Sequence, residues 1–229
     1  MKWEPAERDV LAPVIQRLRD GLDLSDEGRV LVLCSAHGTL AMALAHWTPG
    51  LQVLGLELDD RLRREAQASA IACGLSDRVA FERATYNCIP YPDGTFDALV
   101  SEFIVDGTPK PTEIGQAEMA RVIKPGGTVV LTDVIATEPV SATVRSDLAE
   151  VGLDYLCEAT STDFRRWMTA AGLDELEVAD LTPVAVAAWH LRRRRDPHAP
   201  GYVQLLDGPR SLLGQTILYI YARGKKPIA

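Results

Sequence analysis

A continuous apolar run near the N-terminus constrains the fold of this chain more than any other feature. The run extends from Val30 to Cys34 (VLVLC) and shows no alternation of polar and apolar residues. A strand with one buried face alternates, whereas a strand of a parallel sheet is buried on both faces and is apolar throughout. The run therefore predicts a parallel sheet that is covered by helices on both faces.

The segments around this run alternate between strand and helix patterns. Further strands are expected at 51–58, 78–82, 96–102, 128–134, 176–181 and 215–222, and helices at 9–20, 40–47, 59–73, 111–123 and 161–171. Residues 183–209 show no clear pattern and remain unassigned. The alternation is typical of an α/β domain, and we expect one domain over residues 1–229.

Composition excludes several classes of protein. The net charge of −8 disfavours a general nucleic-acid binder. The first ten residues, MKWEPAERDV, contain no apolar segment of a secretory signal, and the longest uncharged stretch, Val30 to Leu56, is interrupted by Pro49 and Gly50. None of the four cysteines (Cys34, Cys73, Cys88 and Cys157) forms a CxxC pair, so no metal site is expected. We expect reduced thiols, a cytoplasmic location and no membrane partner.

The first turn and the next strand have the spacing of a nucleoside-binding unit. Gly38 precedes Glu57 by 19 positions. In such a unit the turn presents backbone N–H groups to the cofactor, and the carboxylate at the second strand accepts hydrogen bonds from both ribose hydroxyls. An ordinary parallel unit with a solvated Glu57 has the same spacing, so both interpretations remain open. The single glycine argues against NAD, since a pyrophosphate requires a GxGxxG loop.

Two further motifs follow about 30 residues apart. PDGTFD occupies residues 92–97 and leads into a strand, and KPGG occupies residues 124–127 between a helix and a strand. With the unit at Val30 to Ala45 and Glu57, these motifs make the sequence resemble the class I S-adenosylmethionine-dependent methyltransferases. The resemblance is to the small-molecule, methyltransferase type 11-like branch, and it covers residues 28–135.

The resemblance implies a Rossmann-like fold, a site and an activity. The fold would be a seven-stranded, mostly parallel sheet with helices on both faces and an antiparallel last strand, its core at residues 25–135 plus the C-terminal strands. The cofactor would be S-adenosyl-L-methionine, and the reaction would transfer its methyl group to a small-molecule acceptor. The implied cofactor-binding residues are Leu33, Cys34, Ser35, Ala36, Gly38, Glu57, Leu58, Thr85, Tyr86, Ser101 and Glu102.

The chain departs from the family pattern in the first turn. Val32, Cys34 and Ala36 stand where an acid and the first two glycines usually stand, and Thr85 replaces an Asp that is common near the adenine. A non-methylating protein of the same fold, with another reaction in the same site or a structural role, is therefore the alternative function. A weaker similarity to the arsenite methyltransferase branch rests on Cys157 alone, and a buried apolar position in a helix is the favoured interpretation of that cysteine.

The acceptor side of the site is less defined by the sequence. Methyl transfer needs a base only for a protonated acceptor, and no catalytic residue is assigned. Candidate bases are Asp106, Tyr155, His190, Glu102 and His37. Arg192 to Arg195 either attract an acidic acceptor or are simply solvated. Residues 9–20 and 140–210 are expected to cover the acceptor. The acceptor's identity and the oligomeric state stay open.

Overall fold

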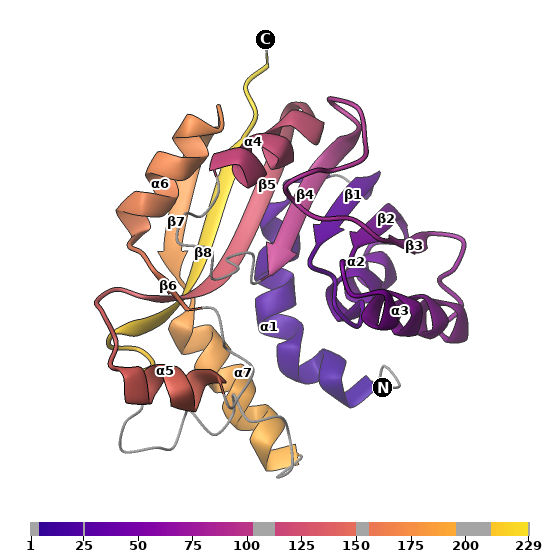
Figure 1. Ribbon diagram of the computed structural model, residues 1–229. Coiled ribbons are helices and arrows are strands. Elements are labelled where there is room, and N and C mark those ends of the chain that lie inside the picture. Colours follow the sequence, from indigo (N-terminus) through magenta and orange to yellow (C-terminus); the bar gives the residue numbers. More distant parts are fainter. Residues whose placement is uncertain (1–4, 25, 103–112, 150–155, 196–211, 229) are drawn as a thin grey trace.

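The computed structural model describes residues 5–24, 26–102, 113–149, 156–195 and 212–228 (Figure 1). Its helices are α1 (Pro5–Gly21), α2 (Thr39–Trp47), α3 (Asp60–Ala72), α4 (Glu113–Val122), α5 (Ala142–Ala149), α6 (Ser161–Ala170) and α7 (Thr182–Arg195). Its strands are β1 (Glu27–Leu33), β2 (Gly50–Leu56), β3 (Val79–Glu82), β4 (Phe96–Glu102), β5 (Ile123–Ala136), β6 (Cys157–Glu158), β7 (Asp174–Asp180) and β8 (Ile217–Lys225).

The strands form one mostly parallel sheet in the order β3-β2-β1-β4-β5-β8-β7, and the short β6 also pairs with β5. The pairs β1–β2, β2–β3, β1–β4 and β4–β5 are parallel, whereas β8 is antiparallel to both β5 and β7. The predicted sheet, with its antiparallel last strand, is confirmed. Leu33 pairs with Leu56 on one side and Ser101 on the other, so β1, β2 and β4 end level with one another.

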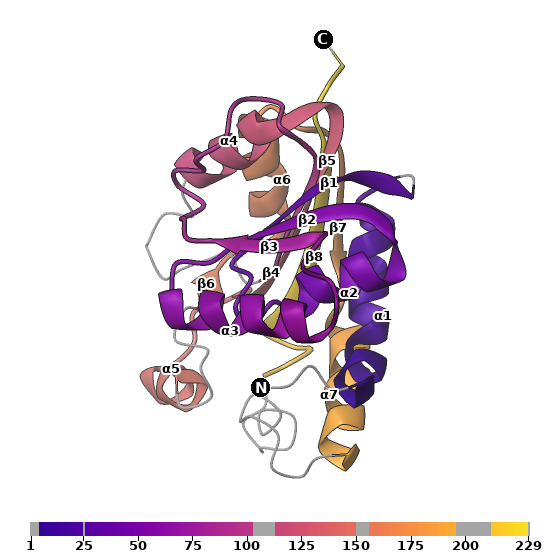
Figure 2. The ribbon, with the colours of Figure 1, turned by 90° about the vertical axis from the view of Figure 1, so that its right-hand side faces the viewer.

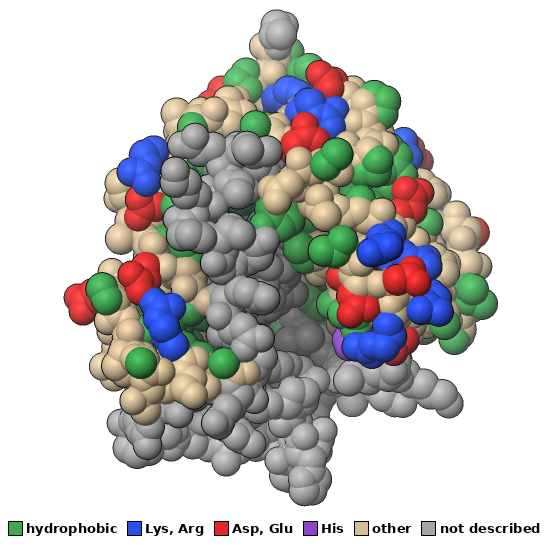
Figure 3. Space-filling view, in the orientation of Figure 1, with side chains coloured by type: hydrophobic (Ala, Val, Ile, Leu, Met, Phe, Trp, Pro, Cys, Tyr) green, Lys and Arg blue, Asp and Glu red, His purple; other side chains and the backbone are tan. Residues whose placement is uncertain are grey.

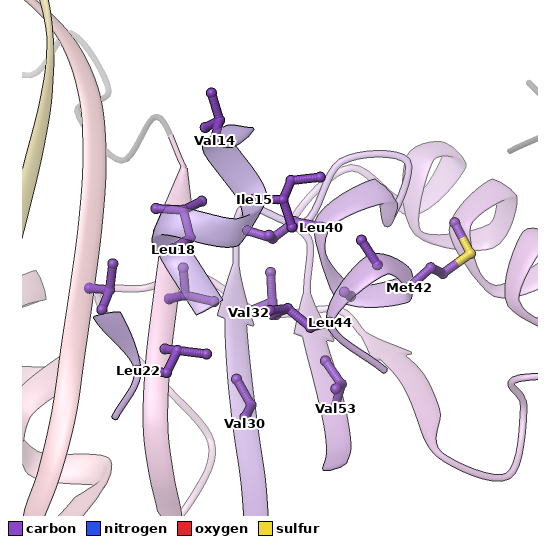
Figure 4. Close-up of a cluster of buried hydrophobic side chains, with 14 of the residues drawn as sticks. Val14, Ile15, Leu18, Leu22, Val30, Val32, Leu40, Met42, Leu44 and Val53 are labelled. Carbon is purple, nitrogen blue, oxygen red and sulfur yellow. The ribbon is translucent and has the colours of Figure 1, made fainter. Parts of the chain in front are cut away.

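Helices cover both faces of this sheet, and the β1 side chains pack alternately into the two layers. Val30 and Val32 belong to a core cluster with residues of α1 and α2, in which Leu18 and Leu44 are fully buried (Figure 4). Leu31 belongs to the other cluster, which includes residues of α4 and α6. These two helices lie on the other side of the sheet from α1 (Figure 2). Both faces of β1 are buried, which explains the unbroken apolar run in the sequence.

The structure differs from the sequence-based expectations in three segments. Helix α1 begins at Pro5, earlier than the expected residue 9, and its side chains at Val14 and Leu18 pack into the core. Residues 182–195, which the sequence pattern left largely unassigned, form α7, which packs against α1. The predicted KPGG turn lies within β5, because Gly126 N–H donates to the carbonyl of Lys226 and the Lys226 N–H donates to the carbonyl of Gly127.

The PDGTFD and KPGG motifs contact each other at the amino ends of the strands. Asp97 accepts a hydrogen bond from Lys124 Nζ at 2.6 Å and another from the Arg29 N–H at 2.8 Å. Burial alone would raise the pKa of Asp97, but these two bonds outweigh it and hold the pKa below its ordinary value. Arg121 donates to Asp93 Oδ1 at 2.8 Å. The motifs therefore hold β1, β4 and β5 together at the edge opposite the loop that follows β1.

No helix in the described ranges is both long enough and apolar enough to cross a membrane.

Candidate functional site

The loop between β1 and α2 lies at the carboxyl edge of the sheet, where parallel α/β sheets bind ligands. Alternate residues of the loop have left-handed backbone: Cys34 has φ 51°, Ala36 has φ 44° and Gly38 has φ 79°. This conformation costs an L-residue about 1–2 kcal/mol, whereas glycine adopts it freely. The structure therefore keeps a glycine-type loop at two positions where the sequence has no glycine.

Glu57 connects this loop to the end of β2. Its Oε2 accepts a hydrogen bond from the Ala36 N–H at 2.7 Å, and its Oε1 accepts one from the Asp59 N–H at 2.9 Å. The side chain is half-buried. A carboxylate has about four acceptor positions, so each oxygen retains capacity for another donor. The sequence predicted a carboxylate beside the turn, and the structure places it in direct contact with the loop backbone.

Gly38 lies where the loop enters α2. It is the N-cap of that helix, no side chain caps the helix, and the first turn contains no acidic residue. The first amides of a helix carry partial positive charge and favour a carboxylate or another anion. A Cβ at Gly38 would lie 2.5 Å from Phe81 Cζ and 3.0 Å from the Ala66 methyl group. The helix start is thus held against β3 and α3 at a position that tolerates only glycine.

The ends of β2 and β3 form the next part of the site. The Glu57 N–H donates to the carbonyl of Glu82 at 3.0 Å, which aligns the two strand ends. Leu58 is 57% exposed, and Arg83 Nε donates to its carbonyl at 3.2 Å. Thr85 and Tyr86 are half-buried in the loop that follows β3. The structure therefore brings the predicted ribose and base regions to adjacent strand ends.

Buried polar side chains lie at the ends of β4 and β5. Ser101 is fully buried, and its hydroxyl donates to the carbonyl of Leu33 at 3.4 Å. Sequence reasoning missed Asp133, a carboxylate that is only 3% exposed and lies in the apolar run of β5. Burial raises the pKa of the Cys157 thiol to about 11, and the charges of Asp133 and two further carboxylates raise it also. The polar pair Thr132-Asp133 within an apolar strand is the signal that would have found this acid.

The remaining predicted residues contribute less to the described site. His37 Nδ1 lies 3.2 Å from Glu65 Oε2 of α3, whose surface carries interleaved acidic and basic side chains (Figure 3). Asp106 and Tyr155 lie outside the described residues. Glu102 is the last residue of β4, and residues 190–195 lie in α7. The side chains of Glu102 and of the arginines at 192–195 lie outside the described part of the structure.

Comparison with known families agrees with this architecture. Residues 30–127, a little under half of the chain, match a family model described as a methyltransferase domain. Over these residues the chain is similar to the methyltransferase family. The match begins in β1 and ends in the KPGG motif, so the matched segment contains the loop, Glu57 and both motifs.

Curated relatives share this domain over part of their length. Norajmaline N-methyltransferase of Rauvolfia serpentina is 28% identical over 157 residues, which are 65% of this chain and 53% of that protein. The 27-O-demethylrifamycin SV methyltransferase of Amycolatopsis mediterranei is 26% identical over 76% of this chain and 64% of that protein. The chain spans about half or less of the first relatives it matches, with shares of 53%, 29% and 43%.

Solved structures resemble this chain over almost its whole length. A geranyl diphosphate methyltransferase in complex with S-adenosylmethionine has a TM-score of 0.77 at 18% identity, covering 96% of this chain and 90% of that one. The 4+2 cyclase SpnF has a TM-score of 0.72 at 22% identity, covering 95% of this chain and 82% of that one. At these identities the likeness establishes the fold.

Proposed function

We propose that this protein transfers the methyl group of S-adenosylmethionine to a small-molecule acceptor. The observation that carries the proposal is the loop after β1, whose backbone is left-handed at residues 34, 36 and 38 and whose Ala36 N–H is bonded to Glu57. A loop of this shape places a helix N-terminus and a ribose-binding carboxylate at the same edge of the sheet. That combination suits a zwitterionic amino acid joined to a nucleoside.

The residues of the site fit such a cofactor. The uncapped N-terminus of α2 suits the carboxylate of its methionine part, and the remaining acceptor positions of Glu57 suit the two ribose hydroxyls. Leu58 and Tyr86 offer apolar surface for the adenine. When bound, the cofactor supplies an electrophilic methyl group and its own leaving group. The protein then has to align the acceptor and exclude water, which requires no catalytic nucleophile.

The acceptor is proposed as a small molecule because the curated relatives are named for such acceptors. The names include an N-methyltransferase, a C-methyltransferase and the rifamycin methyltransferase, so they favour no single acceptor atom. We also propose a single domain over residues 1–229, with residues 140–210 covering the acceptor. A cytoplasmic location is proposed from the free thiols at Cys73, Cys88 and Cys157.

A second candidate function is a reaction without methyl transfer. The fold is shared with a protein that is named a cyclase, and Cys34 and Ala36 replace two glycines of the family turn. In this alternative the protein binds the cofactor weakly, or binds it without transferring the methyl group. Cofactor-dependent methylation of any acceptor by the purified protein would eliminate it.

Calorimetric titration with S-adenosylhomocysteine tests the binding step. We expect binding to the native protein, weaker binding to Glu57→Gln, and native affinity for Glu27→Gln. The control residue is exposed at the opposite end of β1, so its substitution leaves the loop intact. Transfer of labelled methyl groups to a panel of amines, phenols and carbon acids then tests the reaction. Absence of binding at high protein concentration, or affinity for NADH instead, would contradict the proposal.

A further inference from the structure

We propose that Glu57 is also the positioning residue of the loop, and that its carboxylate holds Ala36 in the left-handed conformation in place of the missing glycines. The effect of this role on cofactor affinity rests on the proposed function. The role itself belongs to the protein without ligand. This role goes beyond ribose binding, because here the Glu57 carboxylate supports the backbone of the loop through its hydrogen bond with the Ala36 N–H.

The loop needs support because two of its residues are strained. Cys34 and Ala36 carry side chains at positive φ, so each favours a return to negative φ. Two backbone bonds hold the neighbouring residues: the Ser35 N–H donates to the carbonyl of Leu56 at 3.1 Å, and the Gly38 N–H donates to the carbonyl of Ser35 at 2.7 Å. The Ala36 N–H donates to a carboxylate, which is a stronger, charge-assisted acceptor.

Glu57 is itself held in the orientation that this role requires. The Asp59 N–H bonds its other oxygen, so the carboxylate cannot rotate away from Ala36 without losing a second bond. Asp59 is in turn the N-cap of α3, where its side chain accepts from the N–H groups of Arg61 and Leu62. The start of α3 therefore anchors Asp59, which positions Glu57, which positions Ala36.

A glycine loop would not depend on this bond. Glycine populates positive φ about as readily as negative φ, so Cys34→Gly with Ala36→Gly removes the strain that the carboxylate opposes. Loss of the carboxylate should then disturb the glycine loop less than the native loop. If Glu57 only contacted the ribose, its substitution would reduce cofactor affinity by the same factor in both loops. This difference separates positioning from direct contact.

The experiment is a double-mutant cycle with two measurements. The variants are E57Q, the double variant C34G/A36G, and their combination, with Glu27→Gln as the control. The first measurement is hydrogen exchange of the Ala36 amide in the protein without ligand. We expect its protection to fall at least tenfold in E57Q and to stay native in Glu27→Gln, because a bond to a charged group contributes at least a factor of ten. Protection of the Val100 amide in β4 reports that the fold is intact.

The second measurement is the Kd for S-adenosylhomocysteine. We expect E57Q to raise the Kd at least tenfold more in the native loop than in the C34G/A36G loop. Equal increases in both loops would overturn the positioning role. Unchanged protection of the Ala36 amide in E57Q would also overturn the positioning role. Because this measurement needs no cofactor, failure of the positioning role can be told apart from failure of the proposed function. If E57Q does not fold, E57D gives the same test, because it keeps the charge and shortens the reach.

Discussion

Substitution of Gly38 by alanine should cause the largest loss of stability among the described glycines that have positive φ. The residue has φ 79°, and an added Cβ would lie 2.5 Å from Phe81 Cζ and 3.0 Å from the Ala66 methyl group. Left-handed backbone costs alanine about 1–2 kcal/mol, and overpacking of a dense core costs about 1–3 kcal/mol. The two terms together predict a loss of about 2–5 kcal/mol in the free energy of unfolding.

Gly74 provides a matched control for this prediction. It has φ 67°, but an added Cβ meets no atom within 4 Å. Gly74→Ala therefore retains the backbone strain without the steric contact, and its loss should be about 1–2 kcal/mol. Urea unfolding followed by tryptophan fluorescence measures both variants. Phe81→Leu introduced with Gly38→Ala should recover part of the loss, since a smaller side chain gives the new methyl group room.

Equal losses for Gly38→Ala and Gly74→Ala would refute this reasoning, because the contact with Phe81 would then contribute nothing. The same variant should also lose affinity for S-adenosylhomocysteine, since the residue begins the helix that faces the proposed cofactor. A destabilised variant with native affinity would show that the start of α2 does not contact the ligand.

Three further predictions concern charged and buried polar groups. Asp97→Asn should lower the free energy of unfolding by about 1–2 kcal/mol at pH 7. Because the pKa of Asp97 is lowered in the folded state, the native protein should lose this stabilisation as the pH falls below about 4. Urea unfolding at pH 3 and pH 7 measures the difference. Tyr221→Phe should leave thermal stability unchanged or raise it, since the buried hydroxyl has no hydrogen-bond partner among the described residues. Tyr91→Phe should lower thermal stability, because it removes the 2.8 Å hydrogen bond from the Tyr91 hydroxyl to Glu82 Oε2. Cys157 should react with a thiol reagent at pH 8 far more slowly than the exposed Cys73, since its pKa is raised to about 11; equal rates would contradict its burial.

The candidate site could be predicted from the sequence only in outline. The spacing from Gly38 to Glu57 indicated a turn and a carboxylate at adjacent strand ends, and the structure places them together. The pattern could not indicate that Cys34 and Ala36 keep left-handed backbone, because neither residue type favours it. The resemblance also assigned the PDGTFD and KPGG motifs no position relative to the loop, and the structure places them at the opposite edge of the sheet.

The sequence by itself determined the elements whose signal is local. The apolar run at 30–34 predicts a strand buried on both faces, and the alternation of strand and helix patterns predicts a covered parallel sheet. Tertiary structure alone decided where α7 begins, which atoms of Glu57 contact the loop, and how Asp97 reaches Lys124. Local patterns arise from burial along a single segment, whereas these contacts join residues far apart in the chain and exist only once the sheet has assembled.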